Sequence, residues 1–241
     1  MSQVPQVPQV PGDIASRLAE VRARIGEAAT RADRSPSDIR LIAVSKTFPI
    51  DAIREAYGAG QRDFGENRVQ EALQKVSAGA DMEIRWHLIG HLQSNKSRKA
   101  AESCAVIHSI DSADLLRRLD QAAAAAGQSP EVLVQVDLAL EPTKHGAPVE
   151  TLPAIVDEGR RSVAVKLVGL MLLPPATEKS EEARAWFRRL REVRDGLVSR
   201  GVPATLLREL SMGMSHDYEV AVEEGATMVR VGSAIFGTRA Q

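Results

Sequence analysis

The chain has 241 residues, a length that suits one large domain or two small ones. Hydrophobic residues make up 44% of it and charged residues 26%, which is ordinary for a globular protein. Lys and Arg number 31 against 32 Asp and Glu, so the formal net charge is -1. This balance gives no electrostatic reason to expect nucleic acid or an anionic membrane as a partner, and 3% aromatic residues argue against a base-stacking surface.

The N-terminus and the single cysteine bear on domain limits and compartment. Residues 3–11 repeat Gln-Val-Pro three times, so we expect a disordered tail over residues 1–12 and one domain over residues 13–241. Cys104 lies in an apolar run and is expected to be a buried free thiol, which suits a reducing cytosol. No stretch approaches the roughly 18 apolar residues that cross a bilayer, and we see no secretory signal. We therefore expect a cytoplasmic protein without membrane contact.

From residue 13 onward, helix patterns alternate with strand patterns. Apolar residues recur at helical spacing over residues 13–32, with Asp13 placed to cap the first turn. The strand patterns cover residues 41–46, 62–66, 85–90, 106–110, 132–138, 167–172, 208–212 and 228–232. The intervening helix patterns cover residues 50–59, 68–78, 95–101, 112–126, 149–160, 179–200 and 215–224.

Eight strands that alternate with helices predict parallel pairing through right-handed crossovers. The strand segments are almost continuously apolar, as expected when both faces of a sheet are buried. We therefore predict a single α/β domain, a (β/α)8 barrel of the TIM type. The alternative is an open doubly wound sheet, which is weakened because no glycine-rich phosphate loop follows the first strand.

Reactive groups are sought at the C-terminal ends of the strands, where such barrels carry their sites. Lys46 closes the first apolar strand, and burial there would lower its pKa and free the amine to attack a carbonyl. The alternative is a lysine that simply extends into solvent. Ser211, Gly232 and Ser233 follow the seventh and eighth strands and predict a phosphate site, with ordinary turn chemistry as the alternative.

Arg230 and two histidines complete the set of polar residues. Arg230 stands between valines, so it should be ion-paired or belong to a site. His87 is expected close to a cofactor or satisfied by buried partners. His87 and His91 are four residues apart, but Gly90 would break a helix and no Cys or carboxylate stands at ligand spacing, so we predict no metal site. Two classes remain open: a lysine-dependent aldolase for a phosphorylated sugar, and a pyridoxal phosphate protein.

Seven motifs then carry a resemblance that covers about residues 39–239. They are Ala43–Thr47, Phe64–Asn67 with Gln70 and Glu71, Trp86–Lys96, His108–Asp111, Gly169–Met171, Leu210–Ser215 and Val229–Gly237. On these motifs the chain resembles the pyridoxal phosphate homeostasis proteins. The resemblance implies a barrel like the N-terminal domain of alanine racemase, with pyridoxal 5′-phosphate held by Lys46 as a Schiff base.

The same resemblance implies roles for further residues. Ser211, Gly232 and Ser233 match the phosphate site, and Arg230 matches an arginine near the pyridine nitrogen. Asn67 and His87 fall in motifs that line the cofactor pocket, and Lys144 matches a lysine near the mouth. The chain departs from the family pattern at three positions, where Arg68 replaces Tyr, Asp137 replaces Asn and Leu88 replaces Phe.

These assignments favour binding over turnover. An arginine at the pyridine nitrogen disfavours its protonation and weakens the ring as an electron sink. Racemisation usually needs a second base. In alanine racemase this base is a tyrosine of a second domain, for which this chain leaves no residues, and Tyr57 and Tyr218 are its only tyrosines. A racemase and a sugar-phosphate aldolase remain the alternatives.

We therefore predict a non-catalytic protein that binds pyridoxal phosphate and buffers its pool in the cell. It would pass the cofactor transiently to apoenzymes that depend on it. We expect a monomer, because the second domain that supplies the usual dimer contacts is missing.

Overall fold

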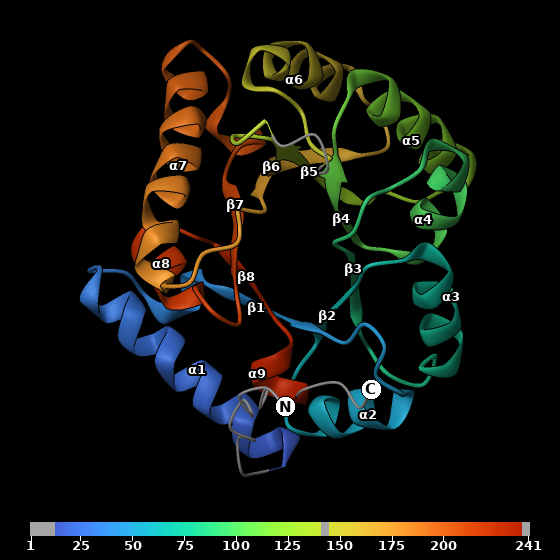
Figure 1. Cartoon of the computed structure of the whole chain (residues 1–241). Helices are drawn as coiled ribbons and strands as arrows, with labels where there is room; N and C mark the ends of the chain where they lie inside the picture. The colour runs from blue at the N-terminus through green and yellow to red at the C-terminus, as the bar shows by residue number, and fades with distance from the viewer. Residues whose placement is uncertain (1–12, 141–144, 238–241) are drawn as a thin grey trace, which may run out of the picture.

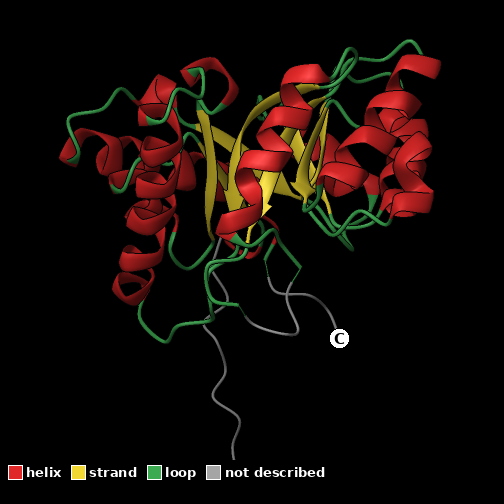
Figure 2. Ribbon diagram, turned by 90° about the horizontal axis from the view of Figure 1, so that it is seen from above, coloured by secondary structure: helices red, strands yellow, loops and turns green. Residues whose placement is uncertain are grey.

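A computed structural model describes residues 13–140 and 145–237, so the tail over residues 1–12 and Lys144 lie outside the described residues. Eight parallel strands pair in chain order, and the first strand pairs with the last to close a barrel. Figure 1 looks along the barrel, with the helices in an outer ring, and Figure 2 shows the strands side by side within it. The predicted (β/α)8 barrel is confirmed.

The limits of the elements lie close to the predicted ones. The strands are β1 (Arg40–Val44), β2 (Asp63–Glu66), β3 (Arg85–Leu88), β4 (Val106–Ile110), β5 (Glu131–Val136), β6 (Lys166–Leu172), β7 (Glu209–Met214) and β8 (Met228–Val231). The helices are α1 (Ile14–Arg31), α2 (Ile50–Gly58), α3 (Val69–Ala78), α4 (Ser97–Ser103), α5 (Ala113–Ala125), α6 (Leu152–Arg161), α7 (Arg184–Ser199), α8 (Tyr218–Glu223) and α9 (Ser233–Phe236). The sequence patterns did not predict the short α9, and they extended β1, β3 and β5 by two residues at their C-terminal ends. Lys46 therefore follows β1 and does not close it.

The apolar side chains form two separate clusters. One fills the space between the strands and the helices and includes the apolar stripe of α1. The other lies inside the barrel and consists of Ile42, Val106, Leu133, Val168, Met171 and Met228. This division follows from the alternation of side chains along each strand. Within the described residues, no helix is long and apolar enough to cross a membrane.

Helix α1 precedes the barrel and packs beside α8 and α9 (Figure 1). It begins as predicted, because the Asp13 side chain accepts a hydrogen bond of 2.7 Å from the Ser16 N–H. The Arg17 Nε donates to the Ile235 carbonyl at 2.6 Å, which links the first helix to the last. The two ends of the described chain are thereby held together.

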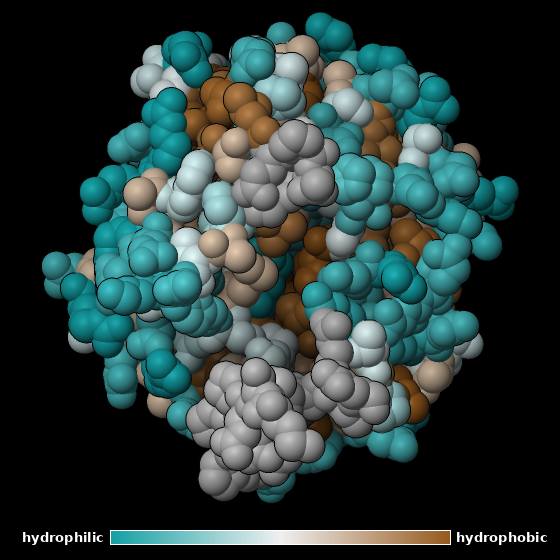
Figure 3. Space-filling model, viewed as in Figure 1, coloured by the Kyte–Doolittle hydropathy of each residue, from teal (hydrophilic) through white to brown (hydrophobic). Residues whose placement is uncertain are grey.

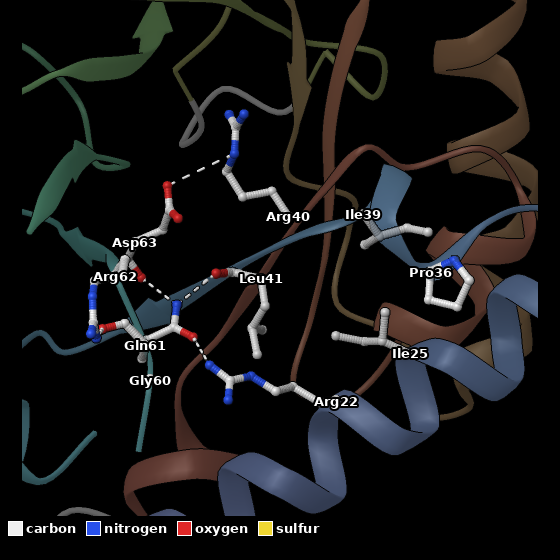
Figure 4. Close-up of a pocket in the computed structure, with 10 residues that line it drawn as sticks. All are labelled: Arg22, Ile25, Pro36, Ile39, Arg40, Leu41, Gly60, Gln61, Arg62 and Asp63. Carbon is white, nitrogen blue, oxygen red and sulfur yellow. Dashed lines mark hydrogen bonds and ion pairs between the residues drawn. The ribbon is translucent and has the colours of Figure 1, made fainter. Parts of the chain in front are cut away.

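The N-terminal end of the barrel contains a cavity of about 450 Å³ between α1 and the starts of β1 and β2 (Figure 4). The Gln61 Nε2 donates to the Leu41 and Asp63 carbonyls, at 2.7 Å each. The Gln61 Oε1 accepts from Arg22 at 3.1 Å. This face serves stability in (β/α)8 barrels, and none of the predicted site residues lines the cavity.

Substitution of Gly169 tests how closely β6 and β7 approach each other. A Cβ at Gly169 in β6 would lie 2.0 Å from the Glu209 carbonyl oxygen, so Gly169→Ala must displace β7. We expect a loss of about 1–3 kcal/mol in the free energy of unfolding, measured by urea denaturation. Gly196→Ala in α7 is the control, because its Cβ would meet no atom closer than 4.0 Å. It should gain about 0.5–1 kcal/mol, and equal effects of the two substitutions would contradict the strand geometry.

Candidate functional site

The C-terminal ends of the strands meet on the face shown in Figure 1, and the space-filling view of this face is hollowed at its centre (Figure 3). Lys46 follows β1 closely, Asn67 follows β2, and Gly232 and Ser233 follow β8. Because β1 pairs with both β2 and β8, the fold brings these residues together. The structure thus places four of the predicted site residues at one part of the barrel mouth.

Lys46 is half-buried and stands in a tight turn. The Ser45 N–H donates to the Gly65 carbonyl at 3.1 Å, and the Phe48 N–H donates back to the Ser45 carbonyl at 3.0 Å. Thr47 has a φ of 68°, in the left-handed region that side chains other than glycine rarely adopt. A turn of this kind persists only where its surroundings hold it.

Lys75 of α3 stabilises this turn through hydrogen bonds. Its Nζ donates to the Ser45 carbonyl at 2.8 Å, to Glu66 Oε1 at 2.7 Å and to Glu71 Oε1 at 2.8 Å. The Ser45 hydroxyl also donates to Glu66 Oε1, at 2.6 Å. Lys75, Ser45 and Glu66 are all buried, so this ion cluster is shielded from solvent. It anchors the residue that precedes Lys46.

Glu71 anchors the residue that follows Lys46. Its Oε1 accepts from the Thr47 N–H at 2.6 Å. The pKa of Glu71 is lowered because, although burial opposes it, hydrogen bonds from Lys75 and the Thr47 N–H favour the charged form. Burial raises the pKa of Glu66, against the hydrogen bonds that it accepts. Both neighbours of Lys46 are therefore fixed to one buried cluster.

Arg230 is a buried cation whose hydrogen-bonding partners are neutral. Its side chain donates to the Ser211 hydroxyl at 2.6 Å and to the Leu172 carbonyl at 2.8 Å, and only 3% of the residue is exposed. Burial lowers the pKa of Arg230 to about 10, although the charge of Asp217 opposes this shift. A buried positive charge with this environment suits an anionic or lone-pair-bearing ligand.

Ser211 begins a chain of polar groups through the barrel interior. The Ser211 hydroxyl lies 2.9 Å from His108 Nδ1, and His108 Nε2 lies 2.9 Å from His87 Nδ1. His87 Nε2 lies 2.9 Å from Asp63 Oδ1. Burial lowers the pKa of both histidines. With both histidine rings neutral, one orientation satisfies every group: Ser211 donates to His108, His108 to His87, and His87 to Asp63.

The hydrogen-bonded series from Ser211 to Asp63 determines how His87 and Ser211 are related to the site. His87 is fully buried, and both of its ring nitrogens are engaged by protein partners. It therefore acts on Arg230 through His108 and Ser211, and a direct contact with a ligand stays a prediction. Ser211 is likewise fully buried beside Arg230, so its part in a phosphate site also stays a prediction.

A pair of backbone amides lies at the start of α9. The N–H groups of Gly232 and Ala234 donate to the Ser215 hydroxyl, at 3.1 and 3.4 Å. Amides that converge on one oxygen can also hold an oxygen of a phosphate group. Ser233 lies between them and is exposed. Ser215 was not singled out from the sequence, although it stands in one of the seven motifs.

The structure also shows the surroundings of Asn67, Arg68 and Asp137. Asn67 is half-buried, and its carbonyl oxygen lies where a Cβ on Gly90 would come within 2.2 Å, so the loop after β3 packs tightly against it. Arg68 is exposed at the start of α3. The Asp137 side chain accepts from the Leu140 N–H at 2.8 Å and so closes the turn after β5.

Two predictions about other groups have clear outcomes. Leu88 is fully buried, in keeping with an apolar position. Cys104 is a buried free thiol, as predicted. Burial raises the pKa of Cys104 to about 11, so the thiol is unreactive at neutral pH.

Known proteins resemble this chain over most of its length. The model of the alanine racemase N-terminal domain matches residues 17–240. The pyridoxal phosphate homeostasis protein of Aquifex aeolicus is 43% identical over 92% of this chain and 97% of its own length. That of Pseudomonas aeruginosa is 44% identical over 94% of this chain and 96% of its own length. The chain belongs to the pyridoxal phosphate homeostasis protein family.

Solved structures agree with this membership in the family. PipY of Synechococcus elongatus PCC7942, a structure with PLP bound, is 43% identical, with a TM-score of 0.83 over 93% of this chain and all of that chain. An alanine racemase of Clostridium difficile is 14% identical, with a TM-score of 0.74 over 95% of this chain and 57% of that chain. The second likeness concerns the fold alone. The resemblance predicted from the seven motifs is confirmed.

Removing the cation of the buried cluster tests its importance for the Lys46 turn. Lys75→Met leaves Glu66 buried without its cationic partner, so we expect a loss of about 3–5 kcal/mol in the free energy of unfolding. Urea denaturation measures this loss. Adding Glu66→Gln to Lys75→Met should recover part of it, whereas Lys99→Met at an exposed position should change little. A loss below about 1 kcal/mol for Lys75→Met would contradict the role of the cluster.

The buried histidines predict a pH dependence of stability. The pKa values of His87 and His108 are lowered in the folded state, so below the ordinary value of 6.5 the unfolded chain binds more protons. Stability should therefore fall as the pH drops below about 6.5, by up to about 1.4 kcal/mol per pH unit for each histidine.

Urea denaturation between neutral pH and the mildly acidic range measures this slope. His108→Gln should reduce the slope, whereas His216→Gln, at an exposed position, should leave it unchanged. A slope that is the same in all three proteins would show that the interior histidines are not its source.

Proposed function

We propose that this chain binds pyridoxal 5′-phosphate covalently through Lys46 and thereby buffers the free cofactor in the cell. The observation that carries the proposal is the buried cation Arg230, with neutral hydrogen-bonding partners, in the same barrel mouth as a lysine held in a rigid turn. The relatives' printed name and the PLP-bound PipY structure support it.

The described residues fit the three parts of the cofactor. The cofactor supplies an aldehyde, which condenses with a lysine amine with loss of water. Lys46 presents that amine from a turn fixed on both sides. The amides of Gly232 and Ala234, together with Ser233, would take the phosphate. Arg230 would face the pyridine nitrogen, and Ser211 and the interior histidines would hold its guanidinium in place.

We propose binding without turnover. An arginine that faces the pyridine nitrogen donates hydrogen bonds and leaves that nitrogen unprotonated, which weakens the electron sink that transamination and decarboxylation require. Neither tyrosine offers a second base. Tyr218 is buried with Arg24 over its ring, and the Tyr57 hydroxyl accepts from the Glu83 N–H while Arg62 covers its ring.

The cellular setting belongs to the same proposal. A buried free thiol suits the reducing cytoplasm, and the half-exposed Lys46 can release its ligand toward solvent. We propose a monomer that passes the cofactor transiently to apoenzymes, with neither nucleic acid nor membrane as a partner.

The test is an absorbance spectrum of the purified protein, recorded after addition of pyridoxal phosphate. We expect a visible band from the lysine adduct in the native chain and none in Lys46→Ala, because that variant lacks the amine. Lys99→Met, at an exposed position of α4, is the matched lysine control and should keep the band. Equal bands in the native chain and Lys46→Ala would overturn the assignment of Lys46, and no band in either would overturn the function.

Assays on the same samples separate the two alternatives. A racemase would convert L-alanine or L-serine when the cofactor is bound. An aldolase would cleave a phosphorylated sugar without pyridoxal phosphate, and borohydride would trap its Schiff base only with that sugar present. We expect neither reaction.

A further inference from the structure

Three side chains with metal-binding groups meet at the barrel mouth, outside the site described above. His91, Asp111 and His145 come from the loops that follow β3, β4 and β5. One ligand atom from each lies within 4.8 Å of the others, and His91 Nδ1 is 3.7 Å from Asp111 Oδ2. Two imidazoles and one carboxylate form a donor set that divalent zinc and its neighbours bind.

The backbone around these side chains is firmly placed. Gly90, next to His91, packs against Asn67, and its carbonyl accepts from the Ser109 hydroxyl at 2.7 Å. This bond connects the loop that carries His91 to the end of β4, just before Asp111. The His145 carbonyl accepts from the Gln135 side chain of β5. The three donors are therefore held by neighbouring strands of a rigid barrel.

The rings of His91 and His145 lie face to face. His91 and His145 stack with their ring centroids 3.7 Å apart and an angle of 12° between the planes. Within residues 13–140 and 145–237, neither ring has a hydrogen-bonding partner, and the ion pair of His91 is with Asp111 of the same cluster.

We propose that His91, Asp111 and His145 form a binding site for a zinc-like divalent ion. Bonds of about 2.0–2.2 Å require donor atoms roughly 3–3.5 Å apart, so the two rings must tilt out of their stack by about 1 Å. Their partial exposure leaves room for this movement. Three protein ligands leave one position open to water or to an anionic group that enters the mouth.

The proposed metal site is independent of the proposed cofactor site. It uses the loops after β3, β4 and β5, whereas Arg230 lies in β8, Lys46 follows β1 and Gly232 follows β8. It also explains why spacing in the sequence indicated no metal. His87 is engaged inside the barrel, and the partners of His91 stand 20 and 54 residues further along the chain, at Asp111 and His145.

Calorimetric titration of the full-length protein with zinc chloride tests the site. We expect one tight site per chain, and a loss of affinity of about tenfold or more in each of His91→Asn, Asp111→Asn and His145→Asn. His216→Asn is the matched control, because this histidine is exposed and outside the cluster. Its affinity should equal that of the native chain.

Repeating the titration in Lys46→Ala keeps the two proposals apart, because zinc binding there should be unchanged whether or not the cofactor binds. Thermal unfolding without zinc checks that each variant is folded. Equal zinc affinity in all variants, or no heat up to millimolar zinc, would overturn the site.

Discussion

Pairing between β1 and β8 closes the barrel, and every group at the candidate site depends on this closure. The register joins Leu41 to Val229 and Ala43 to Val231, so the chain segments that follow the two strands leave the barrel together. Lys46 and Gly232 are separated by most of the sequence but lie on neighbouring strands for this reason. An open sheet of the same strands would leave them at opposite edges. Closure also removes both sheet edges and places the strand ends on one face.

The interior of this barrel buries several polar groups. Uncompensated, each such group would cost several kcal/mol, so their presence requires partners with good geometry. The chain from Arg230 through Ser211, His108 and His87 to Asp63 supplies them, and it spans from the mouth toward the N-terminal end. The result is a guanidinium whose position is fixed before a ligand arrives, which reduces the cost of binding.

The cluster around Lys75 likewise fixes the backbone at Lys46 before a ligand arrives. It holds the turn from both sides and sustains a positive φ at Thr47 that an isolated peptide would rarely adopt. The barrel is shared with alanine racemase, and a fold does not by itself specify a reaction. The chemistry follows from the groups at the barrel mouth. One set contains Lys46 and Arg230. The other contains His91, Asp111 and His145, which follow different strands.

The sequence by itself determined the number, order and type of nearly all elements, because hydrophobic periodicity and helix caps are local properties. It also placed Lys46, Asn67, Gly232 and Ser233 correctly at strand ends, since position along a strand predicts position in a barrel. Only the tertiary structure decided which polar groups meet. Lys75 reaches Ser45, His108 joins His87 to Ser211, Ser215 caps the amides near Gly232, and His91 stacks on His145. Such contacts join residues that are far apart in sequence, and their partners are fixed by strand register and side-chain direction, which no local pattern records.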